Sequence, residues 1–158
     1  MPRTTPTWSD AETSTRPRLA VDGKVTDLPV WTARSRSERR TGLLGTDGID
    51  GAVWITRCSW VHCWGMRYPI DVVYIARSGE VLAVAPLAPG RVGLPCPRAA
   101  AVVEMAQGEA ARLGVVPGAV LSSVVLADPA GLTGPSGAAD AAKAVGAARC
   151  GNVAVQGH

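Results

Sequence analysis

The sequence predicts a mainly β domain: a compact sandwich or barrel of short strands, with one inserted helix and one short helix. Two observations predict this class. Short apolar runs of strand length alternate with turns rich in Gly, Pro and Asp, and only two segments carry helix-end signals. Runs of strands at this spacing indicate a sandwich or barrel, and not a series of parallel strand–helix–strand units.

The composition divides the chain into three parts. Its 158 residues allow one domain with flexible ends. Residues 1–17 are polar and are expected to be a disordered leader, whereas residues 18–126 carry every predicted element. Residues 127–158 are rich in Ala, Gly and Pro, cannot bury enough apolar surface to offset their ordering entropy, and are expected to be disordered.

Tight turns define the predicted hairpins. Asp22-Gly23 tolerates positive φ and suits a turn in the first run, and Ser78-Gly79 joins the two runs that form the clearest hairpin. Pro86–Arg98 contains four prolines and two glycines, so we expect a long surface loop there. Apolar runs of strand length occur at residues 19–21 and 25 around the Asp22-Gly23 turn and at 28–33, 52–56, 70–76, 80–85, 101–105 and 119–126, and we expect five or six short strands from them.

Both predicted helices have recognisable ends. Ser35 and Glu38 fit the capping-box pattern, so a helix is expected over residues 36–44, with Gly45 as its C-terminal cap. A short helix is expected over residues 108–113. The arginines of the first helix, Arg40 among them, form either a solvated face or, beside a pocket, a clamp for an anion.

The stretch from Cys58 to Ile75 concentrates the reactive and aromatic side chains. Asp71 comes directly before the apolar run that ends at Ile75, so its carboxylate must stay at the strand end or find hydrogen-bond donors. We expect it to fix the turn from Gly65 to Ile70 by accepting backbone amides. The alternative is a site acid beside arginine and histidine.

No metal or cofactor is predicted. Cys58, His62 and Met66 are ligand types of a mononuclear copper site, but the second histidine that such a site needs is available only at the chain end, in His158. In an extended segment Cys58 and His62 would lie roughly 13 Å apart, at about 3.3 Å per residue. The cysteines also lack the short paired spacing of a zinc site.

The composition limits the classes of partner and the cellular compartment that we expect. The formal charge of +3 is spread without a basic stripe, so nucleic-acid binding is not expected. No apolar run reaches membrane-spanning length. The first residues lack the apolar core of a signal peptide, so we expect a cytoplasmic protein with reduced cysteines. We also expect a monomer.

Three blocks of sequence resemble the successive signatures of a bacterial and archaeal family catalogued as domain of unknown function 192. They are Arg40–Gly45, Val61–Tyr74 and Val103–Gly108, the last followed by Leu113-Gly114 and Pro117-Gly118. The resemblance covers about residues 19–121 and implies a compact, mainly β domain without an established reaction. By this resemblance, the motif positions of the family correspond in this chain to Gly42, Leu43, His62, Gly65, Met66, Pro69, Asp71, Glu104 and Gly108.

This chain departs from the family pattern at three positions. Thr46 stands where an Arg is common, Trp64 replaces a smaller residue, and Ala119 stands where an acid is usual. Thr46 removes a positive charge from any anion site, and Ala119 leaves no carboxylate at a position where the family usually has one.

Three functions remain open at this point. The first is a non-catalytic module that binds a small polar or anionic ligand in a cleft near His62, Arg67 and Asp71. The second is a hydrolase or lyase that uses His62 with Asp71 or Glu104, and the third is a scaffold or accessory protein that binds another chain through an exposed edge strand. The candidate ligand-binding residues are Arg40, Trp60, His62, Trp64, Met66, Arg67, Asp71, Arg91 and Glu104.

Overall fold

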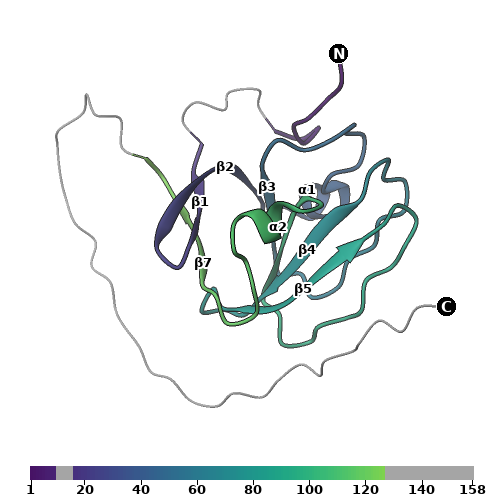
Figure 1. The fold of residues 1–158 in the computed structure, drawn as a ribbon. Helices are drawn as coiled ribbons and strands as arrows, with labels where there is room; N and C mark the ends of the chain where they lie inside the picture. Colours follow the sequence, from purple (N-terminus) through teal and green to yellow (C-terminus); the bar gives the residue numbers. More distant parts are fainter. Residues whose placement is uncertain (10–15, 127–158) are drawn as a thin grey trace. The chain divides into compact units, whose positions relative to one another are not determined.

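The fold is a seven-stranded mixed sheet with two short helices (Figure 1), seen in a computed structural model that describes residues 1–9 and 16–126. The predicted mainly β class is confirmed, but the sheet does not close into a barrel. The remaining residues, including the predicted disordered tail and Cys150, lie outside the described part. The elements are β1 (Arg18–Val21), β2 (Lys24–Ala33), α1 (Arg36–Thr41), β3 (Ala52–Thr56), β4 (Ile70–Ile75), β5 (Val81–Leu87), β6 (Ala101–Ala106), α2 (Glu109–Arg112) and β7 (Leu121–Val124).

The strands lie in the order β5-β4-β6-β3-β2-β1-β7. The long strand β2 pairs with β1 across the predicted Asp22-Gly23 turn, and its second half pairs in parallel with β3. The helix α1 lies in the connection between these two parallel strands, and its predicted capping box between Ser35 and Glu38 is present. The parallel pair was not expected, because a crossover connection has no turn signature in the sequence.

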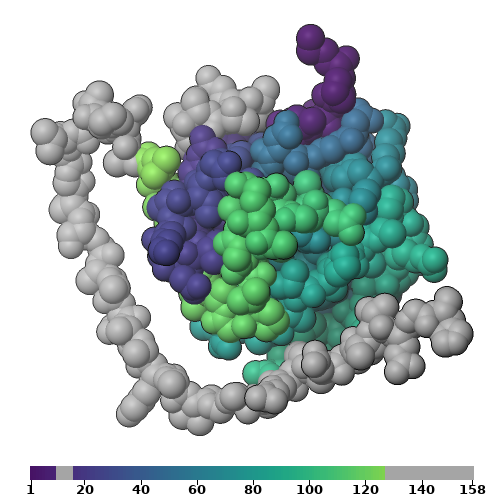
Figure 2. Space-filling view, viewed as in Figure 1, coloured from purple at the N-terminus to yellow at the C-terminus, as the bar shows by residue number. Residues whose placement is uncertain are grey.

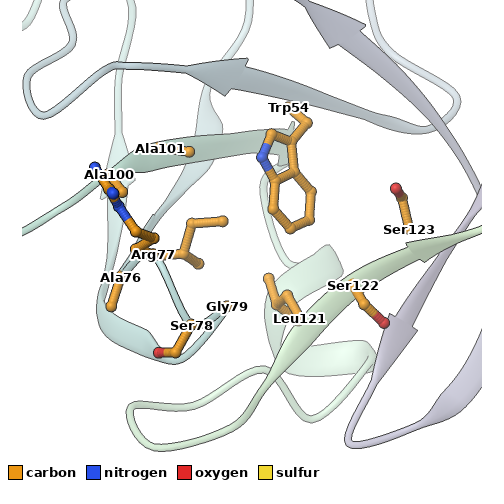
Figure 3. Close-up of a pocket in the computed structure, with 11 residues that line it drawn as sticks. Trp54, Ala76, Arg77, Ser78, Gly79, Ala100, Ala101, Leu121, Ser122 and Ser123 are labelled. Atoms are coloured by element: carbon orange, nitrogen blue, oxygen red, sulfur yellow. The ribbon is translucent and has the colours of Figure 1, made fainter. Parts of the chain in front are cut away.

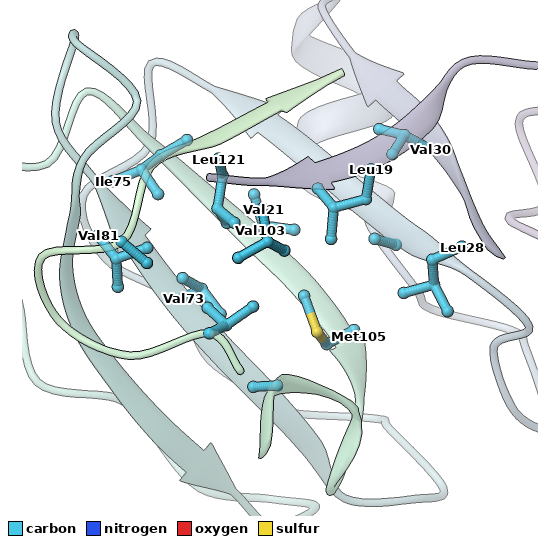
Figure 4. Close-up of a cluster of buried hydrophobic side chains, with 14 of the residues drawn as sticks. Leu19, Val21, Leu28, Val30, Val73, Ile75, Val81, Val103, Met105 and Leu121 are labelled. Carbon is cyan, nitrogen blue, oxygen red and sulfur yellow. The ribbon is translucent and has the colours of Figure 1, made fainter. Parts of the chain in front are cut away.

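The strand β4, which lies between β5 and β6, is buried along its whole length because both faces of the sheet are covered there. Val73 and Ile75 face one core cluster, which α2 and the segment that follows it cover. Side chains from β1, β2, β4, β6 and β7 meet in this cluster (Figure 4), and in the space-filling view α2 and the segment leading to β7 (green) form the surface over it (Figure 2).

The second core cluster lies on the opposite face of the sheet. Ile70, Val72 and Tyr74 of β4 reach it, together with Leu43 that follows α1 and Cys63 from the connection before β4. Its cover is made of connecting segments instead of regular elements. This irregular cover carries most of the residues that the sequence singled out.

The two edge strands, β5 and β7, approach each other near their first residues, where the Val81 amide donates to the Ala119 carbonyl over 2.8 Å and the Gly118 amide donates to the Val81 carbonyl over 2.9 Å. An isolated bridge joins Glu80 to Val120, and the Leu121 amide donates to the Gly79 carbonyl over 2.9 Å. A Cβ at Gly79, whose φ is +90°, would lie 2.6 Å from the Leu121 oxygen, so this close contact requires glycine. Beyond this contact no described strand other than β1 pairs with β7, and we call the gap between the two edge strands the seam.

Residues 1–9 pack against the segment that follows α1, although the sequence led us to expect disorder there. The Trp8 indole donates to the Gly42 carbonyl over 2.9 Å, the Asp47 amide donates to the Arg3 carbonyl over 2.8 Å, and Pro6 is buried. These contacts join residues more than 30 positions apart, so local composition could not reveal them. No helix within the described residues is long and apolar enough to cross a membrane.

Candidate functional site

Two connecting segments, residues 59–64 and 90–96, run antiparallel on the second core cluster and form what we call the aromatic ribbon. His62 and Val92 form its single bridge. The Cys63 amide donates to the Arg91 carbonyl over 2.8 Å, and the Gly93 amide donates to the Val61 carbonyl over 2.9 Å. The ribbon is therefore an ordered two-stranded structure, although its proline content prevents a regular ladder.

Side chains alternate between the two sides of the ribbon, as expected for extended chain. Val61 and Cys63 point inward and are buried, whereas Trp60, His62 and Trp64 point outward. The His62 and Trp64 rings stack with centroids 5.0 Å apart. These three candidate residues therefore lie on one side of the ribbon.

The outer side of the ribbon is an exposed apolar surface. Trp60 and Trp64 are 53% and 60% exposed, and Val92 and Leu94 are 41% and 69% exposed. A hollow of about 560 Å³ lies here, lined by Trp60, Val92, Gly93, Leu94 and Pro95. The Trp60 indole N–H donates to the Gly93 carbonyl over 2.8 Å, so the ring is fixed and offers its apolar face.

Tyr74 of β4 anchors the ribbon from below. Its hydroxyl donates to the Leu94 carbonyl over 2.8 Å, and burial raises the pKa of Tyr74 to about 12, which keeps this donor protonated. A Cβ at Gly93 would lie 2.8 Å from the Tyr74 hydroxyl. The ribbon can therefore sit this close to the sheet only because position 93 is glycine.

Glu104 of β6 lies on the face of the sheet that the ribbon covers, between Val53 and Val72 of the neighbouring strands. It is only 7% exposed, and no hydrogen bond to its carboxylate occurs within residues 1–9 and 16–126. Burial raises the pKa of Glu104 from 4.5 to about 7. Burial, and secondarily the Glu104 charge, raises the pKa of the Cys63 thiol to about 11, so this thiol stays protonated.

Asp71 lies on the opposite face of the sheet from Glu104. Its Oδ2 accepts the Gly108 amide over 2.8 Å and the Ala110 amide over 3.1 Å, and so fixes the start of α2. The expectation that Asp71 accepts backbone amides is confirmed, but the expected turn from Gly65 to Ile70 was the wrong one. The donors come from a turn 37 and 39 residues further along the chain, which local sequence could not indicate.

The remaining candidate residues do not converge on one cleft. Arg67 is exposed and forms an ion pair with Asp47. Arg40 is exposed on α1, Arg91 is exposed on the ribbon, and Met66 packs partly buried against the second core cluster. His62, Arg67 and Asp71 line no common hollow among those identified within the described residues.

The proposed acid–base trio is not assembled either. Asp71 and Glu104 point to opposite faces of the sheet, while His62 is on the outer side of the ribbon. General acid–base catalysis needs its groups within hydrogen-bond reach of one reacting atom or bridged by water. The geometry therefore gives this trio no common reacting centre.

Sequence reasoning missed Val92, Leu94 and Pro95 as site residues and Tyr74 as the anchor. The alternation of Val92 and Leu94 around Gly93 was the available signal, but the surrounding prolines led us to treat the segment as loop alone. Within the described residues Cys58 and Cys63 form no disulfide. Within the described part of the chain, no group of three or more His, Cys, Asp and Glu side chains could hold a metal ion.

Comparisons with known proteins agree with the fold. A protein of unknown function from Novosphingobium aromaticivorans DSM 12444 is 22% identical, with a TM-score of 0.61 over 77% of this chain and 92% of that one. A protein from Sinorhizobium meliloti 1021, described as a candidate transcription regulator, is 26% identical, with a TM-score of 0.58 over 72% of this chain and 98% of that one. No curated protein matches the chain.

The family model described as "Uncharacterized ACR" (DUF192) matches residues 18–123. This match includes all seven strands except the last residue of β7. It also includes both segments of the aromatic ribbon and both buried carboxylates. The chain belongs to the DUF192 family.

Proposed function

We propose that this domain is a non-catalytic binding module and that the aromatic ribbon is its binding surface. The observation that carries this proposal is the hollow of about 560 Å³ next to Trp60, because its volume and apolar lining are those of small-molecule sites. Hydrogen bonds from Trp60 and Tyr74 to the ribbon backbone hold this surface in one arrangement. A preorganised surface loses little entropy when it binds a ligand.

Two basic residues near the hollow favour a ligand with an acidic group. His62 is paired with Val92 across the ribbon, and the exposed Arg91 precedes Val92 in the chain, although neither side chain is among those that line the hollow. An arginine can bind carboxylate or phosphate through two parallel hydrogen bonds. The proposed ligand therefore has an apolar ring or chain that packs on Trp60 and Leu94, with a carboxylate or phosphate at its end.

A ligand panel tests this proposal. Aromatic and aliphatic carboxylates and phosphate monoesters are compared with their uncharged amides and alcohols in a thermal-shift assay, followed by calorimetric titration. We expect at least one acid to raise the melting temperature at millimolar concentration, and its amide to do so less. If no acid on the panel raises the melting temperature, the small-ligand proposal is wrong.

Two leucines provide a matched pair of variants. Leu94 lines the hollow, while Leu126 lies outside it, and they are 69% and 57% exposed. Leu94→Asn and Leu126→Asn should both leave stability nearly unchanged, because neither side chain is buried. Only Leu94→Asn should weaken the binding of the acid. Equal affinities of the two variants for the acid would mean that the binding site is not on the ribbon.

An accessory protein that binds another chain is the second candidate function. Trp64 favours it, because this side chain is 60% exposed yet lies outside the hollow, and tryptophan is enriched at interface hot spots. Trp64→Ala separates the two functions. It should weaken the association with a protein partner more than the binding of the acid, because Trp64 does not line the hollow and reaches the acid site only through its stacking on His62.

The charge of this chain gives no support to a role like that described for the Sinorhizobium protein, a candidate transcription regulator. Nucleic-acid binding depends on a concentrated positive field. The formal charge here is only +3 over 158 residues.

A further inference from the structure

A second hollow, of about 350 Å³, lies at the seam beside β7 (Figure 3). Its apolar lining includes Trp54, Ile75, Ala101 and Leu121, from four different strands. None of its lining residues belongs to the aromatic ribbon. It is therefore a separate feature of the molecule, for which the proposed function gives no role.

The backbone of β7 presents unused hydrogen-bonding groups to this seam. Main-chain groups of successive strand residues point alternately to the two neighbours of a strand. The Val120 carbonyl points to the β1 side, where it accepts the Asp22 amide, and the Leu121 amide points the other way, to Gly79. By this alternation the amide and carbonyl of Ser123 face away from β1, and within residues 1–9 and 16–126 no second strand pairs with β7 there.

The Ser123 side chain also points toward the hollow. Side chains at positions two apart share a face of a strand, so Ser123 lies on the side of the buried Leu121. Figure 3 shows the Ser123 hydroxyl on the side of the Trp54 indole and the Ser122 hydroxyl pointing away. A strand added beside Ser123 would thus place alternate side chains against Trp54.

The two edges of the sheet differ in how they are protected. The edge strand β5 contains Pro86, a residue that blocks the addition of a further strand. β7 has the sequence Leu-Ser-Ser-Val. It contains no proline or lysine, and its pairing with β1 has no β-bulge. An unprotected edge next to an apolar hollow has the two elements of strand-addition recognition, which are main-chain bonds for affinity and a pocket for specificity.

We propose that the free edge of β7 binds an extended peptide segment of a partner protein as an added strand. The Ser123 amide and carbonyl pair with one peptide residue, and a neighbouring apolar side chain of the peptide fills the hollow against Trp54. The Gly79 contact blocks the edge at Leu121, so the added strand extends toward Val125. Arg77 is exposed at the rim of the hollow, which favours a peptide with an acidic residue beside the apolar one.

The test begins with a displayed library of random heptapeptides, selected on the full chain and counter-selected on the variant Ser123→Pro. Proline removes the amide that faces the seam and adds a ring there, yet it leaves the bonds between β7 and β1 intact. A synthetic peptide from the selection is then titrated into isotope-labelled protein. We expect shifts at the Ser123 amide and the Trp54 indole, and binding at least about tenfold weaker in Ser123→Pro, because one main-chain hydrogen bond is lost and the proline ring obstructs the added strand.

Two matched controls isolate the main-chain contribution. Ser123→Ala keeps the backbone edge and should retain the affinity, whereas a peptide N-methylated at the amide opposite Ser123 should lose it, even if Ser123→Pro proves less stable. Equal binding of the N-methylated peptide would overturn strand addition. The proposal is also overturned if the selection yields no peptide sensitive to Ser123→Pro, or if the selected peptides respond to Leu94→Asn instead.

Discussion

At the scale of single residues, the two buried carboxylates behave in opposite ways although their strands are neighbours. Asp71 and Glu104 are each 7% exposed. Two amides donate to Asp71, whereas Glu104 receives no hydrogen bond within the described residues and has a raised pKa. Burial alone therefore does not define the role of a carboxylate, and its donors decide whether it stabilises the fold.

Asp71→Asn should lower the free energy of unfolding. The variant keeps the shape of the side chain but loses the charge in its bonds to the Gly108 and Ala110 amides, and hydrogen bonds to charged groups contribute about 1.5–3 kcal/mol. Denaturant titration measures the change, with Asp50→Asn, at an exposed aspartate, as the control. An unchanged midpoint for Asp71→Asn would show that these bonds do not hold α2.

Glu104 should make the protein less stable as the pH rises from about 4.5 to about 7. Its pKa is raised in the folded state, so in this window the folded state binds more protons than the unfolded state, and stability falls with increasing pH. At about 1.4 kcal/mol per unit of pKa shift, the loss reaches about 3 kcal/mol above pH 7.

Glu104→Gln cannot ionise and removes this pH dependence. Urea titrations of both proteins at pH 4.5, 6, 7 and 8 should show the stability of the variant rising relative to the natural chain across this range. A difference between the two proteins that stays constant with pH would mean that Glu104 ionises as easily in the folded state as in the unfolded state.

At the scale of elements, the sequence predicted what local signals encode and missed what distant contacts decide. The capping box of α1 and the hairpin at Asp22-Gly23 were predicted and are present. The helix α1 nevertheless ends at Thr41 instead of Leu44, and β5 continues through Pro86 to Leu87. Proline tolerates an edge strand, and the sequence alone does not show which strand lies at an edge.

Gly93→Ala should loosen the aromatic ribbon. The added Cβ would lie 2.8 Å from the Tyr74 hydroxyl and 3.3 Å from the Val61 carbonyl oxygen, and such overpacking costs about 1–3 kcal/mol. Gly48→Ala is the control, since the nearest atom there would be 3.8 Å away. Equal unfolding midpoints for the two alanine variants would contradict close packing at Gly93.

Tyr74→Phe completes a double-mutant cycle for the same contact. Alone it removes the bond to the Leu94 carbonyl, at about 1 kcal/mol. Combined with Gly93→Ala it also removes the nearest clashing atom, so the double variant should be more stable than the sum of the two single effects predicts. Strict additivity would mean that the hydroxyl and position 93 do not interact.

At the scale of the whole molecule, the order of the elements followed from turn and apolar patterns, but their arrangement did not. Asp71 and Glu104 were both named as candidate site residues, whereas the strand register places them on opposite faces of the sheet. The side of the ribbon on which Trp60, His62 and Trp64 lie was predictable from alternation. Its position over Tyr74 was not, because that contact depends on tertiary packing.

The two ends of the chain should respond differently to truncation. Both were expected to be disordered, but residues 1–9 contribute a buried proline and a tryptophan bonded to Gly42. Removing them should lower the free energy of unfolding by at least about 2 kcal/mol, through lost apolar burial and hydrogen bonds. Removing residues 127–158 should leave it unchanged, because the core clusters of the described residues all lie before Leu126. Thermal and denaturant unfolding of the two truncated chains measures the difference, and an N-terminal truncation as stable as the full chain would mean that residues 1–9 do not hold the segment after α1 in solution.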